Sequence, residues 1–565
     1  MTKIINRYYL IILALIFVLA FFLRFNKLAS IPNGLYQDET AIGYNAYSIL
    51  TTGKDEYGKA FPLYFKSFGD QKLPVYIYTT VISEKLFGVN AFAVRFPSAF
   101  FGLLTVGIFY FFVRQLTKDK KIAIVSTFLL AINPWSLDYN RATFEVSICL
   151  FLFVSGSYLL LKSFEKKKLG LFLGGTILFI TCLYSYNLTR LLSPVLYGLL
   201  LFLNKRNLKH VPKPEYFVTT IVSLILLLPF IFSIFSSGGA SSATGTFLFS
   251  SNAVKAPLLE FRSYFIYHEL FSKLFLNTWV LLVWQYLSNI VTYFSTPFLF
   301  VSGSTHGNHG IGNFGQFYPF EFPLIIFGII VLIKKKIEGR SLLFWWGILT
   351  ILVASLTRDI PQATRSIFLV VPLEIFSAIG LISLISELKV IKQKYIQLSV
   401  LIVVMLTIIY SIGFYFSSYY VRFPIYYAKQ WRQQDAELSK YIKANESYYD
   451  HIIFDSKSGF IYTSYLFYSL YSPDSFYNGV KRLPDDKEGF SKVENFGKFE
   501  FRDINWQSDY KTPRTLIITN NNSRPKEIPV DITFKYPVRP VVQSVGEELS
   551  IFPVEDIAYE VVKSK

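Results

Sequence analysis

The chain has 565 residues, of which 52% are hydrophobic and 18% are aromatic, and its formal net charge is +18. A soluble protein of this length would divide into domains with polar surfaces, whereas here long apolar runs recur along the sequence. The positive charge does not indicate a nucleic-acid-binding protein, because acids and bases are nearly balanced after residue 429 and the excess lies among the apolar runs.

Several apolar runs are long enough to cross the hydrocarbon layer of a membrane as helices. In chain order they cover 8–23, 96–113, 122–132, 146–161, 171–183, 217–235, 367–385 and 398–416. Lys and Arg gather in short loops between the runs, at 118–121, 166–168, 205–209, 334–336 and 389–394. The positive-inside rule assigns these loops to the cytoplasm, so the sequence predicts a polytopic α-helical membrane protein with about 11 to 13 transmembrane helices.

Three segments leave alternatives open. We interpret the first run as an uncleaved helix with its N-terminus inside, because it is long and no A-x-A site follows it; a cleaved signal peptide is the alternative. Residues 278–294 are interpreted as interfacial or re-entrant, since a span there would move the basic loop at 334–336 outside. Residues 75–87 are interpreted as a helix lying on the membrane.

The predicted membrane domain covers residues 1–420, with outer loops at 27–90 and 237–320, and the tail at 421–565 differs in composition. In the tail, "AKQWRQQDAELSKYIKA" has the apolar spacing of a helix, and "DHIIFD", "TLIITN" and "DITFKY" are typical of short strands. We therefore expect a small soluble α/β domain outside the cytoplasm. A lid or recognition module is favoured over a second enzyme, because no nucleotide-phosphate loop is visible.

The two cysteines of the chain, Cys149 and Cys182, both lie within apolar runs, and the tail has none. The sequence therefore predicts no disulfide framework.

The predicted topology collects polar residues at the outer helix ends. A pair of acids, Asp38-Glu39, follows the first helix in "GLYQDETAIGYNAYSIL", where ionisable groups are costly and indicate function. For most of the other charged loop residues, simple exposure to water is the alternative explanation of their charge. The full set is Asp38, Glu39, Asp70, Lys72, Asp138, Arg141, Glu145, Arg190, His306, His309, Glu321, Arg358, Asp359 and Arg365.

Cations and carboxylates together favour a phosphorylated lipid as the substrate. Arg and Lys bind phosphate oxygens, whereas carboxylates act as general bases or hold a hard divalent ion such as Mg²⁺ or Mn²⁺ that contacts the phosphate. Residue chemistry alone leaves the metal and the reaction open.

Several segments resemble one family of membrane enzymes. "LRFNKLASIPNGLYQDETAIGYNAYSI", "GDQKLPVYIY" and "NPWSLDYNRATFE" are similar to outer-face segments of the GT-C superfamily of glycosyltransferases, most closely family 39 with its ArnT-like and protein mannosyltransferase-like members. "NHGIGNFGQFYPFEFP" and "LTRDIPQATRS" resemble later segments. The chain departs from the family pattern at Leu73, where Pro is usual, at Glu145, where Asp is frequent, and at Gln362, where His is expected.

The resemblance implies a transferase that moves a sugar from a polyprenyl-phosphate carrier to an acceptor on the extracytoplasmic face, with inversion. It implies Asp38 as general base and Glu39 as its support. The donor phosphate would be bound by Lys72, Arg141, Arg190 and Arg365, and Asp70 and Glu145 would contact a metal or the acceptor. His309, in a His-x-x-His pair with His306, is a weaker candidate for a metal or for phosphate.

The alternative function is a transporter or flippase of a lipid-linked sugar, although no inverted repeat is visible in the sequence. A third possible function is a non-catalytic membrane scaffold that presents the tail. The expected partners are the lipid-linked sugar, membrane lipids and an acceptor protein, lipid or glycan; no nucleic acid and no nucleotide cofactor are expected. The expected location is the cytoplasmic membrane, with the tail on the outer side.

Overall fold

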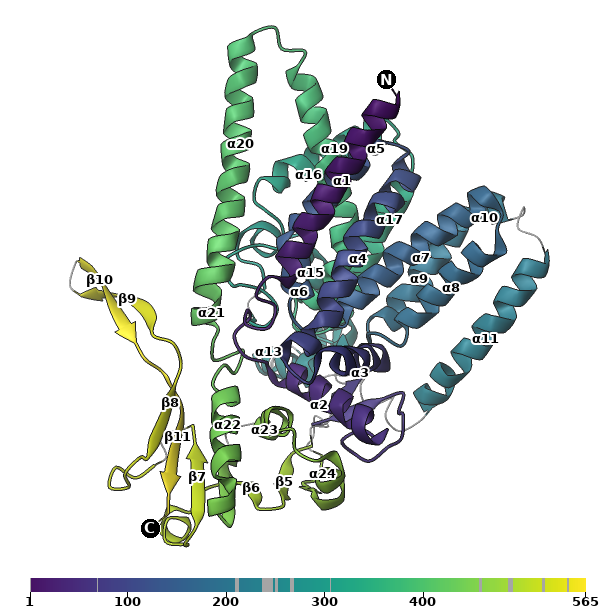
Figure 1. Cartoon of the computed structure of the whole chain (residues 1–565). Helices are drawn as coiled ribbons and strands as arrows, with labels where there is room; N and C mark the ends of the chain where they lie inside the picture. Colours follow the sequence, from purple (N-terminus) through teal and green to yellow (C-terminus); the bar gives the residue numbers. More distant parts are fainter. Residues whose placement is uncertain are drawn as a thin grey trace. The chain divides into compact units, whose positions relative to one another are not determined.

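The structure of the chain is a computed structural model, drawn in Figure 1. It describes residues 2–68, 70–208, 213–235, 247–248, 252–264, 269–304, 306–456, 460–485, 491–520, 524–545 and 548–564. These residues form two compact units: unit 1 comprises Met1–Asn26 and Ser98–Phe416, and unit 2 comprises Lys27–Pro97 and Ser417–Lys565.

Unit 1 is helical. Its helices are α1 (Thr2–Phe25), α4 (Ala91–Thr117, whose residues up to Pro97 belong to unit 2), α5 (Lys120–Ile132), α6 (Pro134–Asn140), α7 (Val146–Lys166), α8 (Leu169–Cys182), α9 (Thr189–Leu203), α10 (Lys205–Leu208), α11 (Lys213–Phe235), α13 (Asn252–Ser263), α14 (Glu269–Phe275), α15 (Thr278–Tyr293), α16 (Glu321–Lys334), α17 (Arg340–Ala354), α18 (Ala363–Ser366), α19 (Val370–Leu388) and α20 (Lys394–Ser417). Most of them coincide with the apolar runs of the sequence, as expected for membrane helices.

Five helices in the described part of the chain are long and apolar enough to cross a membrane, or six if the bent pair α5 and α6 forms one span. Four further apolar helices have only 10–17 residues. The polytopic helical fold is therefore confirmed in its coarse form, whereas the count of 11 to 13 spans stays a prediction.

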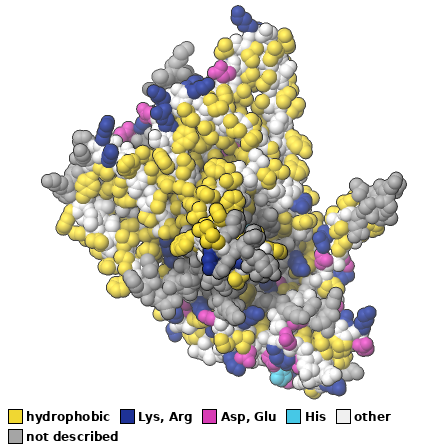
Figure 2. Space-filling view, turned by 180° about the vertical axis from the view of Figure 1, so that it is seen from behind, with side chains coloured by type: hydrophobic (Ala, Val, Ile, Leu, Met, Phe, Trp, Pro, Cys, Tyr) yellow, Lys and Arg dark blue, Asp and Glu magenta, His cyan; other side chains and the backbone are white. Residues whose placement is uncertain are grey.

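Hydrophobic side chains cover much of the helical surface visible in Figure 2. Helix α20 is the clearest case, because only 11% of its most apolar stretch of residues is buried. Large apolar residues on it, such as Leu398, Leu406 and Ile409, are more than half exposed. A surface of this kind is stable in lipid rather than in water.

Helices α16 and α19 approach one another closely at two glycines. A methyl group on Gly328 would lie 1.9 Å from the carbonyl oxygen of Phe376, and one on Gly380 would lie 1.9 Å from that of Leu324. Small residues permit such backbone contact between membrane helices.

Unit 2 combines short helices with a mixed sheet. Its helices are α2 (Gln37–Thr52), α3 (Pro74–Phe87), α21 (Phe423–Tyr426), α22 (Asp435–Asn445), α23 (Ile461–Ser469), α24 (Pro473–Gly479) and α25 (Trp506–Asp509). Its strands are β1 (Phe65–Ser67), β2 (Asp70–Lys72), β3 (His451–Asp455), β4 (Lys481–Arg482), β5 (Val493–Phe496), β6 (Phe499–Arg502), β7 (Thr515–Thr519), β8 (Ile532–Lys535), β9 (Arg539–Val545), β10 (Glu548–Val554) and β11 (Ile557–Lys563).

Seven of these strands form one sheet in the order β4-β5-β6-β3-β7-β11-β8. The three strands predicted in the tail are confirmed as β3, β7 and β8. The predicted tail helix begins at Asp435 rather than near residue 428, because residues 427–434 form turns. Strand β3 lies in the centre and pairs in parallel with β6 and β7.

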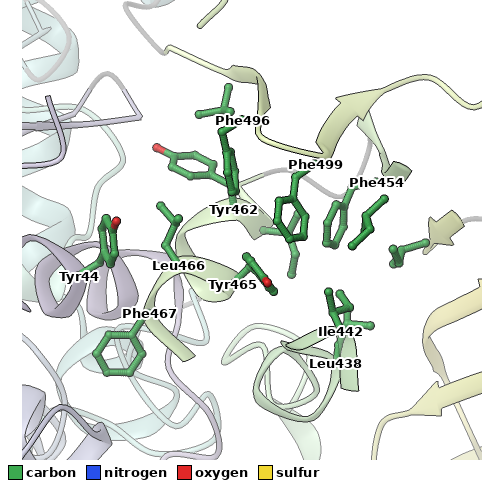
Figure 3. Packing of buried hydrophobic residues seen from close by; sticks show 14 of the residues in the cluster. Tyr44, Leu438, Ile442, Phe454, Tyr462, Tyr465, Leu466, Phe467, Phe496 and Phe499 are labelled. Carbon is green, nitrogen blue, oxygen red and sulfur yellow. The ribbon is translucent and has the colours of Figure 1, made fainter. Parts of the chain in front are cut away.

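The first outer loop folds with the tail. Helix α2 contributes Tyr44 to the same hydrophobic cluster as Tyr465, Phe467 and Phe499 of the tail (Figure 3). Gly43 allows the close contact, because a methyl group there would lie 2.5 Å from the ring of Phe467. The sequence divided the chain at residues 420 and 421, whereas the compact units group the segment 27–97 with the tail.

Candidate active site

Asp38 and Lys72, which are 34 positions apart, form an ion pair in unit 2. Asp38 lies in the first turn of α2, and Lys72 is the last residue of β2. The ammonium nitrogen of Lys72 lies 2.6 Å from Oδ1 of Asp38 and 5.0 Å from the centre of the Phe68 ring. Only 4% of the Lys72 side chain is exposed, compared with 34% of the Asp38 side chain. The structure thus presents a carboxylate, held by a buried cation, at a partly open position.

Glu39 and Arg95 form a second ion pair, and both side chains are fully buried. Nε of Arg95 donates to Oε1 of Glu39, and a terminal nitrogen donates to Oε2, each at 2.9 Å. Oε2 also accepts a hydrogen bond of 3.3 Å from the backbone N–H of Tyr36, at the start of α2. Glu39 therefore anchors the beginning of the helix that carries Asp38.

The guanidinium group of Arg95 also organises the loop before α2. It donates to the backbone carbonyl oxygens of Leu28, Pro32 and Gly34, so with the two bonds to Glu39 all five of its N–H groups are used. Gly34 has φ of +76°, and a methyl group there would lie 2.5 Å from the carbonyl oxygen of Trp431. Arg95 was not among the predicted site residues; its position directly before the apolar run at 96–113 was the available signal.

In unit 1, Arg141 is buried and donates to the backbone carbonyl oxygens of Leu23 and Asn26, at 2.6 and 2.7 Å. Arg190 donates to the carbonyl oxygen of Leu183 at 3.4 Å, and its guanidinium carbon lies 5.5 Å from the centre of the Phe230 ring. The predicted role of both arginines in phosphate binding stays a prediction.

Glu145 and Arg365 lie near Tyr186 in a second polar region of unit 1, and His309 lies near Arg365. Burial raises the pKa of the Tyr186 hydroxyl, Arg365 opposes that rise and Glu145 adds to it, so both charges act on this tyrosine. Arg365 also donates to the backbone carbonyl of Arg358. Tyr186 was not predicted, because an isolated tyrosine in an aromatic-rich sequence gives no signal.

His309 faces Thr364, with 3.0 Å between its Nδ1 and the threonine hydroxyl oxygen, and that hydroxyl lies 2.9 Å from the hydroxyl of Tyr139. Burial lowers the pKa of His309 to about 4, with His306 and Arg365 adding to the effect. His309 is therefore neutral near pH 7, which suits hydrogen bonding.

Side-chain ligands for a divalent metal ion are scattered in the described part of the chain. Among the residues that the structure describes, no three His, Cys, Asp or Glu side chains come close enough together to hold one. Asp38 and Glu39 are each bound to a cation. Asp70 pairs with Ser67 in the β1–β2 hairpin, but its side chain lies outside the described part.

A cavity of about 460 Å³ lies in unit 1 beside the loop that leads to Arg365. It is lined by residues of α13 and α15, among them Trp284 and Asn289, and by residues 357–360. Its lining is both apolar and polar, as is usual for ligand cavities.

Residues 71–232 match the family model of dolichyl-phosphate-mannose-protein mannosyltransferases. No curated protein matches the chain significantly.

Two kinds of solved structure share the fold. ArnT from Cupriavidus metallidurans, bound to undecaprenyl phosphate, is 12% identical with a TM-score of 0.52, and the match covers 90% of this chain and 93% of ArnT. The oligosaccharyltransferase AglB from Archaeoglobus fulgidus, in complex with an inhibitory peptide and a dolichol-phosphate, is 12% identical with a TM-score of 0.51. That match covers 91% of this chain and 69% of AglB.

Identities this low show a shared fold, and neither the family match nor the fold supports the transporter alternative. The family match over residues 71–232 and the shared fold agree with the resemblance to GT-C membrane glycosyltransferases that the sequence motifs indicated.

Proposed function

We propose that the chain transfers a sugar from a polyprenyl-phosphate carrier to an acceptor on the extracytoplasmic face of the cytoplasmic membrane, with inversion at the anomeric carbon. The observation that carries the proposal is the contact of 2.6 Å between Asp38 and Lys72, in a chain related to lipid-phosphate-sugar transferases. The acceptor is a protein, a lipid or a glycan.

In this reaction an acceptor hydroxyl oxygen attacks the anomeric carbon, and the bond from that carbon to the phosphate oxygen breaks. Asp38 takes the proton of the hydroxyl, and the lipid phosphate leaves with the electron pair of the broken bond. One base and a stabilised phosphate are sufficient, because the donor already carries its energy in the phosphate–sugar bond. No nucleotide is needed.

Lys72 has two tasks in this proposal. Its ammonium group holds the Asp38 carboxylate, and it supplies positive charge for the phosphate oxygens of the donor as they gain charge. Arg141, Arg190 and Arg365 are further candidates for the phosphate.

Glu39 acts through Arg95 and the start of α2 rather than on the substrate, which makes it a positioning residue. The buried pair fixes the first turn of α2, and an error of about 1 Å in the position of a base can cost about 10²-fold in rate.

Asp70 and Glu145 are candidates for acceptor contacts, and His309 is a candidate for binding phosphate as a neutral donor. A role for Mg²⁺ or Mn²⁺ stays open to test through metal removal, and no step of the reaction above is assigned to an ion.

The proposal is tested with purified protein and polyprenyl-phosphate sugars of defined structure, by mass analysis of the lipid phosphate released. Asp38→Asn keeps the size of the side chain and removes the base, so we expect a loss of about 10²- to 10⁴-fold in release. The matched control is Lys535→Gln, which removes the cation of an exposed ion pair with Glu555 and leaves Asp38 and Lys72 intact.

The Lys535 variant should release lipid phosphate at the wild-type rate. Release near the wild-type rate in a folded Asp38→Asn variant would refute the assignment of the base. Movement of intact donor across vesicle membranes without release of lipid phosphate would favour the transporter.

A further inference from the structure

A group of buried polar atoms in unit 2 makes no hydrogen bond of normal geometry with the described residues. They are Oδ2 of Asp55, Oε1 of Glu56, the hydroxyl of Tyr57, Oγ of Ser67, the hydroxyl of Tyr462 and Nε of Arg482. We name these six residues the Glu56 cluster. Looser polar contacts are present, because Ser67 lies near Glu56, Ser491 near Tyr57 and the backbone of Phe68 near Tyr462. Glu56 is 1% exposed, and Asp55 and Ser67 are fully buried.

The cluster is held together by short contacts. The guanidinium carbon of Arg482 lies 3.8 Å from the centre of the Tyr57 ring, and a terminal nitrogen of Arg482 donates to the backbone oxygen of Glu56 at 3.1 Å. The Tyr462 hydroxyl is close enough to be affected by the charges of Glu56 and Arg482, and Figure 3 shows it pointing away from Phe499 and Phe454. The six atoms therefore belong to one site.

Unsatisfied buried polar atoms are rare in folded proteins, and a group of them indicates a ligand or ordered water. Burial raises the pKa of Glu56 to about 7, with Arg482 opposing the rise. The buried carboxyl groups of Asp55 and Glu56 would repel phosphate, which argues against an anionic ligand. The guanidinium group of Arg482 likewise argues against a metal ion.

The chemistry of the cluster matches a sugar. Each hydroxyl of a sugar both donates and accepts hydrogen bonds, carboxylates accept two of them, and the N–H of a guanidinium group donates one. The ring of Tyr57, which is partly exposed, offers an apolar surface for the C–H groups of a sugar ring.

The position of the cluster connects it to the reaction. Lys72 acts electrostatically on Glu56, and the same Lys72 binds Asp38. Tyr462 lies in α23 and Arg482 in β4, so the tail completes the cluster. Tyr57 and Arg482 are partly exposed, which places the cluster directly below the surface of unit 2.

We propose that the Glu56 cluster is a sugar-binding subsite that takes neighbouring hydroxyl groups of a sugar ring. The sugar belongs either to the lipid-linked donor or to an acceptor glycan, and its role in transfer rests on the proposed function. The tail would then serve as a recognition module.

Direct binding tests the subsite without any turnover. The full-length protein, in a detergent without a sugar head group, is mixed with methyl glycosides of mannose, glucose, galactose and arabinose, and saturation transfer is measured by NMR. We expect transfer to at least one glycoside, and binding weaker by about tenfold or more in Glu56→Gln. Tyr57→Phe, which removes only a hydroxyl, should weaken binding by about threefold or more.

Glu84→Gln is the matched control, because Glu84 is a second buried carboxyl group of unit 2, 2% exposed and outside the cluster. It should bind the glycosides as the wild type does. Absence of saturation transfer from every glycoside would overturn the proposal, as would wild-type binding in both Glu56→Gln and Tyr57→Phe, which is the result expected if only water fills the cluster.

Kinetics separates the two sources of the sugar. A raised KM for the donor in its hydrolysis without acceptor, in Glu56→Gln, assigns the subsite to the donor; a raised KM for the acceptor alone assigns it to the acceptor. Failure of the proposed function is distinguished by the wild-type protein, which would then release no lipid phosphate from the donor, whatever the binding experiment shows.

Discussion

The buried pair of Glu39 and Arg95 permits a quantitative prediction about unit 2. Glu39→Gln keeps the size of the side chain but removes its charge, and so leaves the guanidinium group of Arg95 buried without a counter-ion. Both side chains are 0% exposed, and both contacts that the pair makes measure 2.9 Å. Breaking a buried pair on one side costs about 3–5 kcal/mol.

That loss corresponds to a fall of roughly 6–20 °C in the unfolding midpoint, if a domain of about 150–250 residues loses 2–4 °C per kcal/mol. The assay is thermal unfolding of the purified protein in detergent, followed by intrinsic fluorescence. Glu84→Gln is the control, because both carboxyl oxygens of Glu84 are buried and make no hydrogen bonds with the described residues. Burial raises the pKa of Glu84 to about 9, so its carboxyl group is neutral at pH 7, as an amide is.

We therefore expect a large fall in the midpoint for Glu39→Gln and a rise for Glu84→Gln at pH 7, because the unfolded wild-type chain gains stability by releasing the Glu84 proton and the unfolded variant does not. A Glu39→Gln midpoint within about 2 °C of the wild type would refute the argument that the pair stabilises unit 2. Equal falls in both variants would show that any buried carboxylate is needed, whatever its partner.

Three further predictions follow from particular residues. The folded protein retains the proton of Glu84 up to about pH 9, whereas the unfolded chain releases it near the ordinary pKa of 4.5. The contribution of this carboxyl group to stability therefore falls as the pH rises between these two values. Glu84→Gln should remove this part of the pH dependence of the unfolding midpoint. Gly380→Ala should destabilise the protein by about 1–3 kcal/mol, because the new methyl group would meet the backbone of Leu324, whereas Gly413→Ala, with open space around it, should not. Chelation of divalent ions should leave release of lipid phosphate unchanged, because no three side-chain metal ligands come together among the described residues. A loss of rate that Mn²⁺ restores would contradict this prediction.

Local patterns predicted the parts of the fold that depend on neighbouring residues. Apolar runs predicted most membrane helices, and alternation with turn residues predicted β3, β7 and β8. The number of spans could not be predicted in the same way, because several runs form helices of only 10–17 residues. Hydropathy measures composition along a window, whereas the length of a helix is also set by prolines, glycines and tertiary packing.

The site shows the same division between local and long-range information. The sequence indicated that Asp38 and Lys72 matter, since each lies in a motif of its own, and the structure brings them into contact. The Glu56 cluster could not be predicted, because "KDEYG" resembles an ordinary solvated turn. Its partners Tyr462 and Arg482 come from the tail, roughly 400 positions away, and no periodicity connects segments so distant.

The two adjacent acids of the first outer loop have different environments for a geometric reason. Neighbouring residues on a helix point about 100° apart, so Asp38 and Glu39 cannot share one partner. Glu39 points into unit 2 and meets Arg95, whereas Asp38 remains one-third exposed and meets Lys72. A lysine at position 95 could not replace the arginine, because its three N–H groups are too few for the five hydrogen bonds that fix the loop and the helix start. The buried acid thus holds in place the helix turn from which the exposed acid acts, and this is why an acidic pair is stable so soon after the first apolar run of the chain.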